Sequence, residues 1–180
     1  MIKTIKIKNT LFLLLVLFLG ACNMTPSMTA LEYNNKIVDE QNKIITKILA
    51  FYDATAAGSE TSEKLRLKAS EQCKTSLKVI KALPDFEGET RLRDAAVELL
   101  LFYQTMADKS FVEMMEIIEK GEEITQDDLA QLEKIEADIT NKEILLDDEL
   151  AKAQEAFSKK HNVTLVENEI QQKIDGLDTE

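Results

Sequence analysis

The chain has 180 residues, of which 33 are acidic and 22 basic, so its formal net charge at pH 7 is −11. A surface this acidic repels phosphate backbones, which excludes nucleic acid as the expected partner. A zinc site would need more nitrogen or sulfur ligands than the single histidine and two cysteines supply.

Residues 1–21 are predicted to be a cleaved export signal. They begin with three lysines and no acidic residue, continue with nine consecutive apolar residues at 11–19, and end in small residues. A helix of nine residues reaches about 14 Å, less than half of the roughly 30 Å hydrocarbon core of a bilayer. The apolar run is therefore too short to be a membrane span.

The segment Leu19-Gly20-Ala21-Cys22 follows directly. It resembles the lipobox of bacterial lipoproteins, and this resemblance implies cleavage before Cys22, lipid on the Cys22 thiol and acylation of the new amino terminus. The alternative is an ordinary secreted protein with a cysteine here by chance, but position, flanks and spacing favour the lipoprotein. Several acyl chains, such as palmitate, on one residue give stable attachment, whereas a single chain gives only marginal binding.

The lipid on Cys22 predicts a location in the cell envelope, with the membrane as the first partner. Asn23 is not the aspartate associated with inner-membrane retention in some bacteria, so an outer membrane is favoured where one exists. Cleavage would remove three lysines and leave a net charge of about −14, which keeps the protein body off anionic lipid. The expected organisation is a signal at 1–21, a lipidated tether at 22–29, one helical bundle domain at 30–175 and a loose acidic tail at 176–180.

Apolar residues at helical spacing predict a first helix over 28–57 and a second over 62–83. Gly58 is expected to end the first helix in a left-handed cap, and Pro84 cannot continue the second. Phe86, in the turn after Pro84, is expected to lie against the core. The first helix carries a broad apolar stripe formed by Leu31, Ile37, Val38, Ile44, Ile45, Ile48, Phe51 and Tyr52.

Asn34 and Gln41 fall within this stripe. They are predicted to form a buried polar layer that sets the register of the helices, as such residues do in coiled coils. The alternative is that they line a small polar cavity. We favour the first interpretation, because a cavity that carries out chemistry would normally collect titratable groups.

A third helix is predicted over 89–120, with a wide apolar face that includes Met106, Met114 and Met115. We interpret this face as core packing of a central helix. The alternative is a groove lined by methionines and aromatic residues, for an apolar ligand or a partner helix. Copper binding by the thioethers would require converging sulfur atoms, which this spacing does not predict.

A fourth helix is predicted to start at the N-cap Thr125, with Asp128 three residues later, and to end near 160. Its second face is predicted to be a solvated acidic surface rather than a cation site, because it lacks the loop spacing of calcium ligands. The residues of that face are Glu133, Glu136, Asp138, Glu143, Asp147, Asp148 and Glu149. The apolar residues of 163–174 predict a short last helix folded onto the bundle.

Three of the four glycines after Cys22 lie at the expected corners between helices, and neither proline lies inside an expected helix. Alternating strand patterns are missing. The predicted fold is all-α, an up-down-up-down four-helix bundle of long helices with a short C-terminal helical tail.

The segments 33–41, 83–88 and 100–103 read Tyr-Asn-Asn-Lys-Ile-Val-Asp-Glu-Gln, Leu-Pro-Asp-Phe-Glu-Gly and Leu-Leu-Phe-Tyr. They resemble a family of uncharacterised, all-helical bacterial surface lipoproteins of the spirochaete type. The resemblance covers most of the chain after Cys22. It brings no assigned activity and therefore no site residues.

No catalytic grouping is expected. Cys73 lies in an apolar helical pattern and is interpreted as a small core residue rather than a reactive thiol. His161 is expected beyond the end of the last helix, and Ser158, not an acid, precedes it by three residues, so the Glu-x-x-His pairs of di-iron bundles are absent. An enzyme that uses carboxyl groups alone would need a concave pocket with perturbed carboxylates.

The leading hypothesis is therefore a membrane-anchored, non-enzymatic helical module for binding or envelope structure, without a cofactor and with a possible protein partner in the envelope. The rival is a carrier that holds a small ligand or metal inside the bundle, using Asn34, Gln41 and the methionines.

Overall fold

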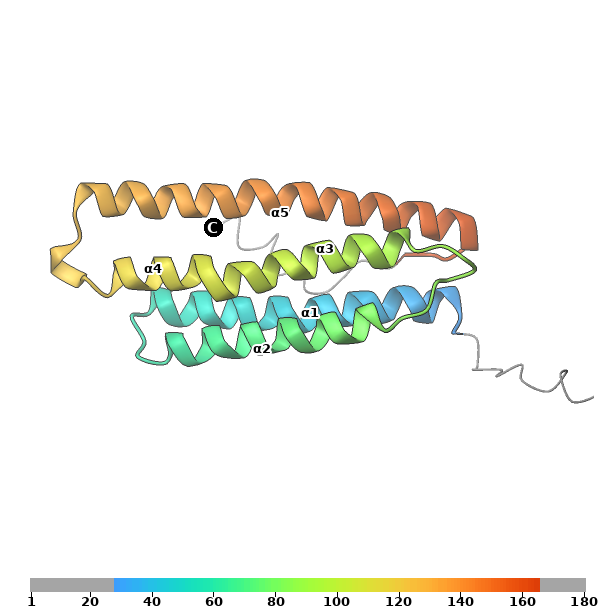
Figure 1. The fold of residues 1–180 in the computed structure, drawn as a ribbon, viewed down its shortest axis with the longest axis horizontal. Helices are drawn as coiled ribbons and strands as arrows, with labels where there is room; N and C mark the ends of the chain where they lie inside the picture. The colour runs from blue at the N-terminus through green and yellow to red at the C-terminus, as the bar shows by residue number, and fades with distance from the viewer. Residues whose placement is uncertain (1–27, 166–180) are drawn as a thin grey trace, which may run out of the picture.

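A computed structural model of the chain describes residues 28–165, and the first 27 and last 15 residues lie outside it. The described part is an up-down-up-down bundle of four helical rods without strands, which confirms the predicted fold class. The rods are α1 (Ala30–Ala56), α2 (Ser62–Lys81), a third rod in three parts, and α5 (Gln126–His161). Figure 1 shows the rods running alternately in opposite directions along one long axis.

The helix ends follow local chemistry. Thr125 caps α5, and its side chain and that of Asp128 satisfy each other's backbone N–H groups, as predicted. An equivalent capping box, formed by Thr29 and Glu32, starts α1. The sequence analysis did not predict this second capping box. Gly58 directly follows the C-cap of α1 and has a φ of +63°, a left-handed conformation that glycine adopts without strain.

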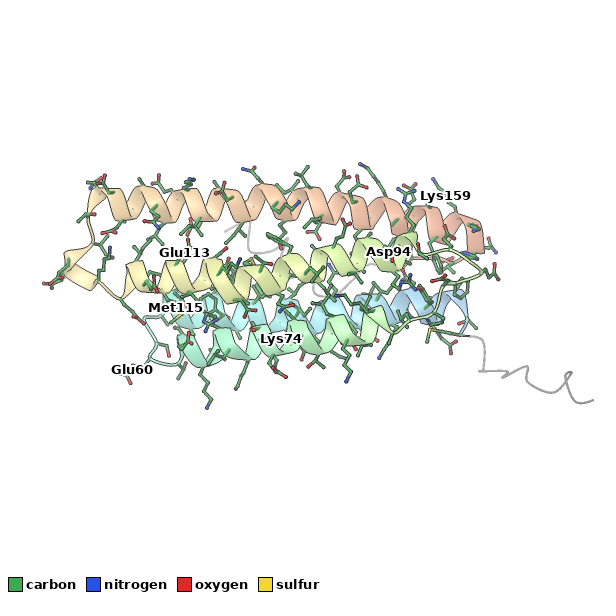
Figure 2. The ribbon with its side chains drawn as sticks, in the orientation of Figure 1. Glu60, Lys74, Asp94, Glu113, Met115 and Lys159 are labelled. Atoms are coloured by element: carbon green, nitrogen blue, oxygen red, sulfur yellow. The ribbon has the colours of Figure 1, made fainter. Side chains whose placement is uncertain are left out.

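The core face of α1 is narrower than the predicted stripe. Ile37, Ile44 and Phe51 are fully buried, whereas Leu31 and Tyr52 are 47% and 36% exposed. The broad stripe thus includes positions, such as Leu31, that stay largely exposed in the described bundle. Charged side chains such as Glu60 and Lys74 lie on the outside of the bundle (Figure 2).

The prediction of one continuous third helix over 89–120 is wrong. The rod begins as α3 (Arg91–Thr105), widens into a π-helical segment η1 (Met106–Ser110), and continues as α4 (Phe111–Ile118). A 3₁₀ turn, η2 (Gly121–Glu123), leads on to α5. A π segment adds one residue to the turn and thereby changes which side chains face each neighbour.

Two side chains of α2 hold η1 in this geometry. Arg66 Nη1 donates to the carbonyl oxygen of Ala107 at 2.8 Å, and Ser70 Oγ donates to Asp108 Oδ1 at 2.5 Å. Arg66 is itself buried and pairs with Glu63 at 2.6 Å. These contacts between helices have no local sequence signature, which explains why periodicity alone predicted an unbroken helix.

The four rods do not pack equally. Helix α1 packs extensively against α2, α2 packs against α3, and α3 packs against α5, but α1 approaches α5 at few places. The seam is closed at one end, where Gln154 donates to Asn34 Oδ1 at 3.1 Å and the rings of Tyr33 and Phe157 stack 5.6 Å apart. Further along, the seam between α1 and α5 is open.

The end of the described chain differs from the prediction. Asn162 takes a left-handed conformation with φ of 54° and ends α5, and residues 163–165 are not helical. The rest of the predicted tail helix lies outside the described residues, as do the signal, Cys22 and most of the tether. Phe86 packs against the core next to Tyr33 and Phe157, as predicted.

Candidate functional site

The open seam contains a groove of about 420 Å³, which we call the α1–α5 groove. Its polar lining comes from three rods and consists of Gln41, Tyr103, Thr140, Glu143 and Asp147. Its apolar lining consists of Ile45, Ile48, Leu49, Tyr52, Met106 and Ile144. A concave space of this size with a few convergent polar groups is typical of small-molecule sites.

Tyr103 lies at the bottom of the α1–α5 groove and joins its walls. The side chain is 2% exposed, and its hydroxyl interacts with Glu143 of α5 and Gln41 of α1. Burial raises the pKa of Tyr103 well above its ordinary value, and the negative charges of Glu143 and Asp147 act in the same direction. The phenol therefore stays protonated and serves as a hydrogen-bonding group.

Glu143 and Asp147 supply the acidic wall. They lie one turn apart on α5 and thus on the same face of that helix. Burial raises the pKa of Glu143, although its hydrogen bond with Tyr103 acts in the opposite direction. Burial, followed by the like charge of Glu143, raises the pKa of Asp147 from 3.8 to about 6.

The two acids of this wall differ in their charged partners from the exposed acid beside them. Within residues 28–165, neither Glu143 nor Asp147 forms an ion pair with lysine or arginine at 4.0 Å or less. The neighbouring Asp148, by contrast, is exposed and pairs with Lys152 at 2.6 Å.

The acidic wall corrects the sequence prediction, which placed Glu143 and Asp147 on a solvated face. A signal for Glu143 was present: it continues the three- and four-residue spacing of the buried positions Ile139, Leu146 and Leu150. An acid at a core position of an amphipathic helix is a marker of an unusual site. Asp147 follows one turn later, and the sequence reasoning had grouped both with the exposed acids around them.

The π segment helps to shape the α1–α5 groove. Met106, its first residue, is buried and lies in the lining, directly one turn after Tyr103. Such segments occur frequently at functional sites because they re-aim side chains. Met106 is the one methionine of the predicted cluster that lines the groove; Met114 is buried in the core.

The two residues of the predicted polar layer have different environments. Asn34 is 5% exposed and bonded to Gln154 across the closed end of the seam. Gln41 is half-buried and lines the α1–α5 groove. The polar-cavity alternative therefore describes Gln41, while the contact of Asn34 with α5 is of the kind that sets register.

His161 is the last residue of α5, not a residue beyond it. Its ring packs on Phe86 and Phe157, with centroids 4.9 and 4.5 Å away, and its nitrogens lie 3.6 Å from Glu87 and 3.3 Å from Glu89. It thus fastens α5 to the connection between α2 and α3. His161 lies 18 residues along α5 from Glu143, so this contact is separate from the α1–α5 groove.

Cys73 is completely buried in the core, and burial raises its pKa to about 12. A thiol in this state is a poor nucleophile and metal ligand. Across residues 28–165 we find no group of three or more histidine, cysteine or acidic side chains suited to holding a metal ion.

Comparisons of the chain with protein-family models, with curated proteins and with solved structures found no match. In the described part of the chain, no helix is both long and apolar enough to cross a membrane. The α1–α5 groove and the sequence of the first 22 residues are therefore the features of this chain that bear on its function.

Proposed function

We propose that this protein is a lipid-anchored binding module of the bacterial cell envelope, without enzymatic activity, and that the α1–α5 groove is its binding site. The observation that carries the proposal is the groove itself: a space of about 420 Å³ with polar and apolar walls, at the seam where α1 has little contact with α5 in the described bundle. The groove supports the alternative hypothesis of a small-ligand carrier more than it supports a purely structural role.

The lipid anchor on Cys22 is inferred from the sequence of residues 1–22. Seven residues separate Cys22 from Ala30, where α1 begins, and seven extended residues span at most about 25 Å. Lipid on Cys22 would hold the start of α1 near the membrane. Metabolic labelling with palmitate and detergent partitioning test this part: Cys22→Ser should lose the label and move to the aqueous phase, and unchanged labelling would contradict the anchor.

The arrangement of the acids favours binding over catalysis. Glycoside hydrolysis by carboxyl groups places the two groups on either side of the scissile bond. Glu143 and Asp147 come from one face of one helix, so both approach a bound molecule from the same side. This geometry suits neutralisation of a charge better than in-line acid and base chemistry.

Native mass spectrometry of the protein released from its own envelope in mild detergent tests the groove. We expect a bound species of small mass that is lost when Ile45→Trp fills the groove, while the exposed-site control Leu67→Trp on α2 retains it. A spectrum that contains the lipidated chain alone, at several detergent concentrations, would contradict the proposal.

A protein partner is the second candidate, because Ile144 and Leu145 are 60% and 62% exposed at the rim of the groove and beside it. A photo-reactive amino acid at Leu145, used in intact cells, distinguishes the two. A discrete protein adduct that requires Leu145, and is absent with the label at Leu67, would favour a protein partner over a small ligand.

A further inference from the structure

The charge of the α1–α5 groove identifies the class of molecule it would hold. Other acids of the described bundle that are buried or half-buried have partners: Glu40 accepts from Ser76 and Lys43 at 2.7 Å each, and Asp128 pairs with Lys120. Glu143 is hydrogen-bonded to the phenol of Tyr103. Asp147 has no hydrogen-bond or ion-pair partner within residues 28–165. The groove therefore concentrates negative charge that the described fold leaves uncompensated.

A carboxylate in a space with restricted access to water is stabilised by an opposite charge within a few ångströms. Tyr103 from α3 and Tyr52 from α1 interact with this wall, and Glu136 of α5 adds negative charge near Tyr52. Within residues 28–165, none of these groups is a cation. A positively charged ligand would remove the mutual repulsion of Glu143 and Asp147.

The other walls determine what the rest of that ligand must be. Ile45, Leu49 and Ile144 present hydrocarbon, and Tyr52 presents an aromatic ring at the rim, 36% exposed. Aromatic faces attract organic cations. A hydrated metal ion would leave these apolar walls unused, and two carboxyl groups fall short of the ligand number of a calcium site.

We propose that the α1–α5 groove binds a small organic cation with an apolar body, such as an alkylammonium or arylammonium compound. Glu143 and Asp147 neutralise its charge, and Ile45, Leu49 and Ile144 cover its body. This inference rests on the proposed function of the groove and names the ligand class for it.

Isothermal titration of the full lipidated chain in a non-ionic detergent tests the inference. The probe is 4-phenylbutylammonium, and the control ligand is 4-phenylbutanol, which has the same apolar body and no charge. At about pH 8 we expect the ammonium compound to bind at least about tenfold more tightly than the alcohol. The preference should disappear near pH 5, where Asp147 binds a proton while the amine keeps its charge.

Matched variants separate the groove from the general acidity of the protein. Asp147→Asn and Glu143→Gln should each weaken binding of the ammonium probe by about tenfold or more. Asp148→Asn and Glu149→Gln make the same change of net charge at exposed neighbouring positions, with side chains 58% and 60% exposed, and should leave the affinity within about twofold.

Three results would overturn the inference. Equal affinity for the alcohol and the ammonium probe would show an apolar groove that does not select charge. Equal losses in Asp147→Asn and Asp148→Asn would show long-range attraction only. Absence of binding by either probe would also reject the ligand class, whereas the proposed function would still stand if native mass spectrometry found a neutral species in the groove.

Discussion

Helix α1 packs closely against α2 on one side and leaves a groove toward α5 on the other, and each side contains an acid that is shielded from water. On the α2 side, burial alone would raise the pKa of Glu40, but hydrogen bonds from Lys43 and Ser76 outweigh it and the pKa is lowered. On the α5 side, burial raises the pKa of Asp147 to about 6. Within residues 28–165, Glu40 has hydrogen-bond and ion-pair partners, whereas Asp147 has none.

We propose that this difference distinguishes an acid that holds helices together from an acid that binds a ligand. A buried carboxylate with donors from the neighbouring helix stabilises the packing of the two helices. A half-buried carboxylate without a cation lowers the stability of the fold, and a ligand that supplies the charge recovers that free energy. Variants on the two sides of α1 test this difference.

The largest expected effect concerns two adjacent isoleucines. Ile44 is fully buried in the core, and Ile45 is half-buried in the groove lining. Ile44→Ala should lower the free energy of unfolding by about 2–5 kcal/mol because it leaves a cavity, and Ile45→Ala by about 1 kcal/mol. Urea denaturation of both variants measures this, and equal losses would mean that the two seams are packed alike.

The next effect concerns the hydrogen bond between Ser76 and Glu40. Ser76→Ala removes a donor at 2.7 Å from a buried carboxylate and should cost about 1–3 kcal/mol at pH 7. Because the pKa of Glu40 is lowered in the fold, this stabilisation is present above its ordinary value of 4.5 and is lost as the pH falls through the folded value. Thr75→Ala, at an exposed neighbouring position, is the control; an equal loss there would reject the interpretation.

The third effect has the opposite sign. The pKa of Asp147 is raised from 3.8 to about 6, so ionisation above pH 4 destabilises the fold, increasingly up to about pH 6. Asp147→Asn should therefore increase the free energy of unfolding at pH 7, by on the order of 1 kcal/mol after allowance for solvent screening, and the gain should vanish below about pH 4. Thermal unfolding at several pH values measures this gain, with Asp148→Asn as the control. A loss of stability in Asp147→Asn would contradict the interpretation that Asp147 is an acid without a compensating charge.

The smallest effect concerns the end of the α1–α5 seam that is closed by the contact between Gln154 and Asn34. Gln154→Ala removes the partner of the buried Asn34 and should cost about 0.5–1.5 kcal/mol. Gln131→Ala, at an exposed position of α5, is the matched control and should change stability by less than about 0.5 kcal/mol. No difference between the two variants would mean that the Asn34 contact does not hold α1 to α5.

Most of the fold was predictable because it depends on local signals. The corner at Gly58, the box formed by Thr125 and Asp128, and the stop at Pro84 act within a few residues. The π segment was not predictable, because its stabilising donors, Arg66 and Ser70, are about forty residues away in the chain and reach it only when α2 packs beside it.

The candidate site was predictable only in part. Gln41 was identified from its place in an apolar stripe, with a polar layer and a polar cavity as the two alternatives. Glu143 showed a comparable signal but was assigned to the solvated face, since the six other acids of that face obscured it. Asp147 had no distinguishing signal, because its contrast with Asp148 depends on which neighbours each side chain meets.

The sequence by itself determined the four-rod helical architecture, its corners and the expectation of a lipid on Cys22, because periodicity, caps and a short segment around a cysteine act over a few residues. The tertiary structure decided which seam of the bundle stays open and which acids face it. Those properties depend on the relative placement of α1, α3 and α5, because the pKa of an acidic side chain is set by the groups that packing brings within a few ångströms.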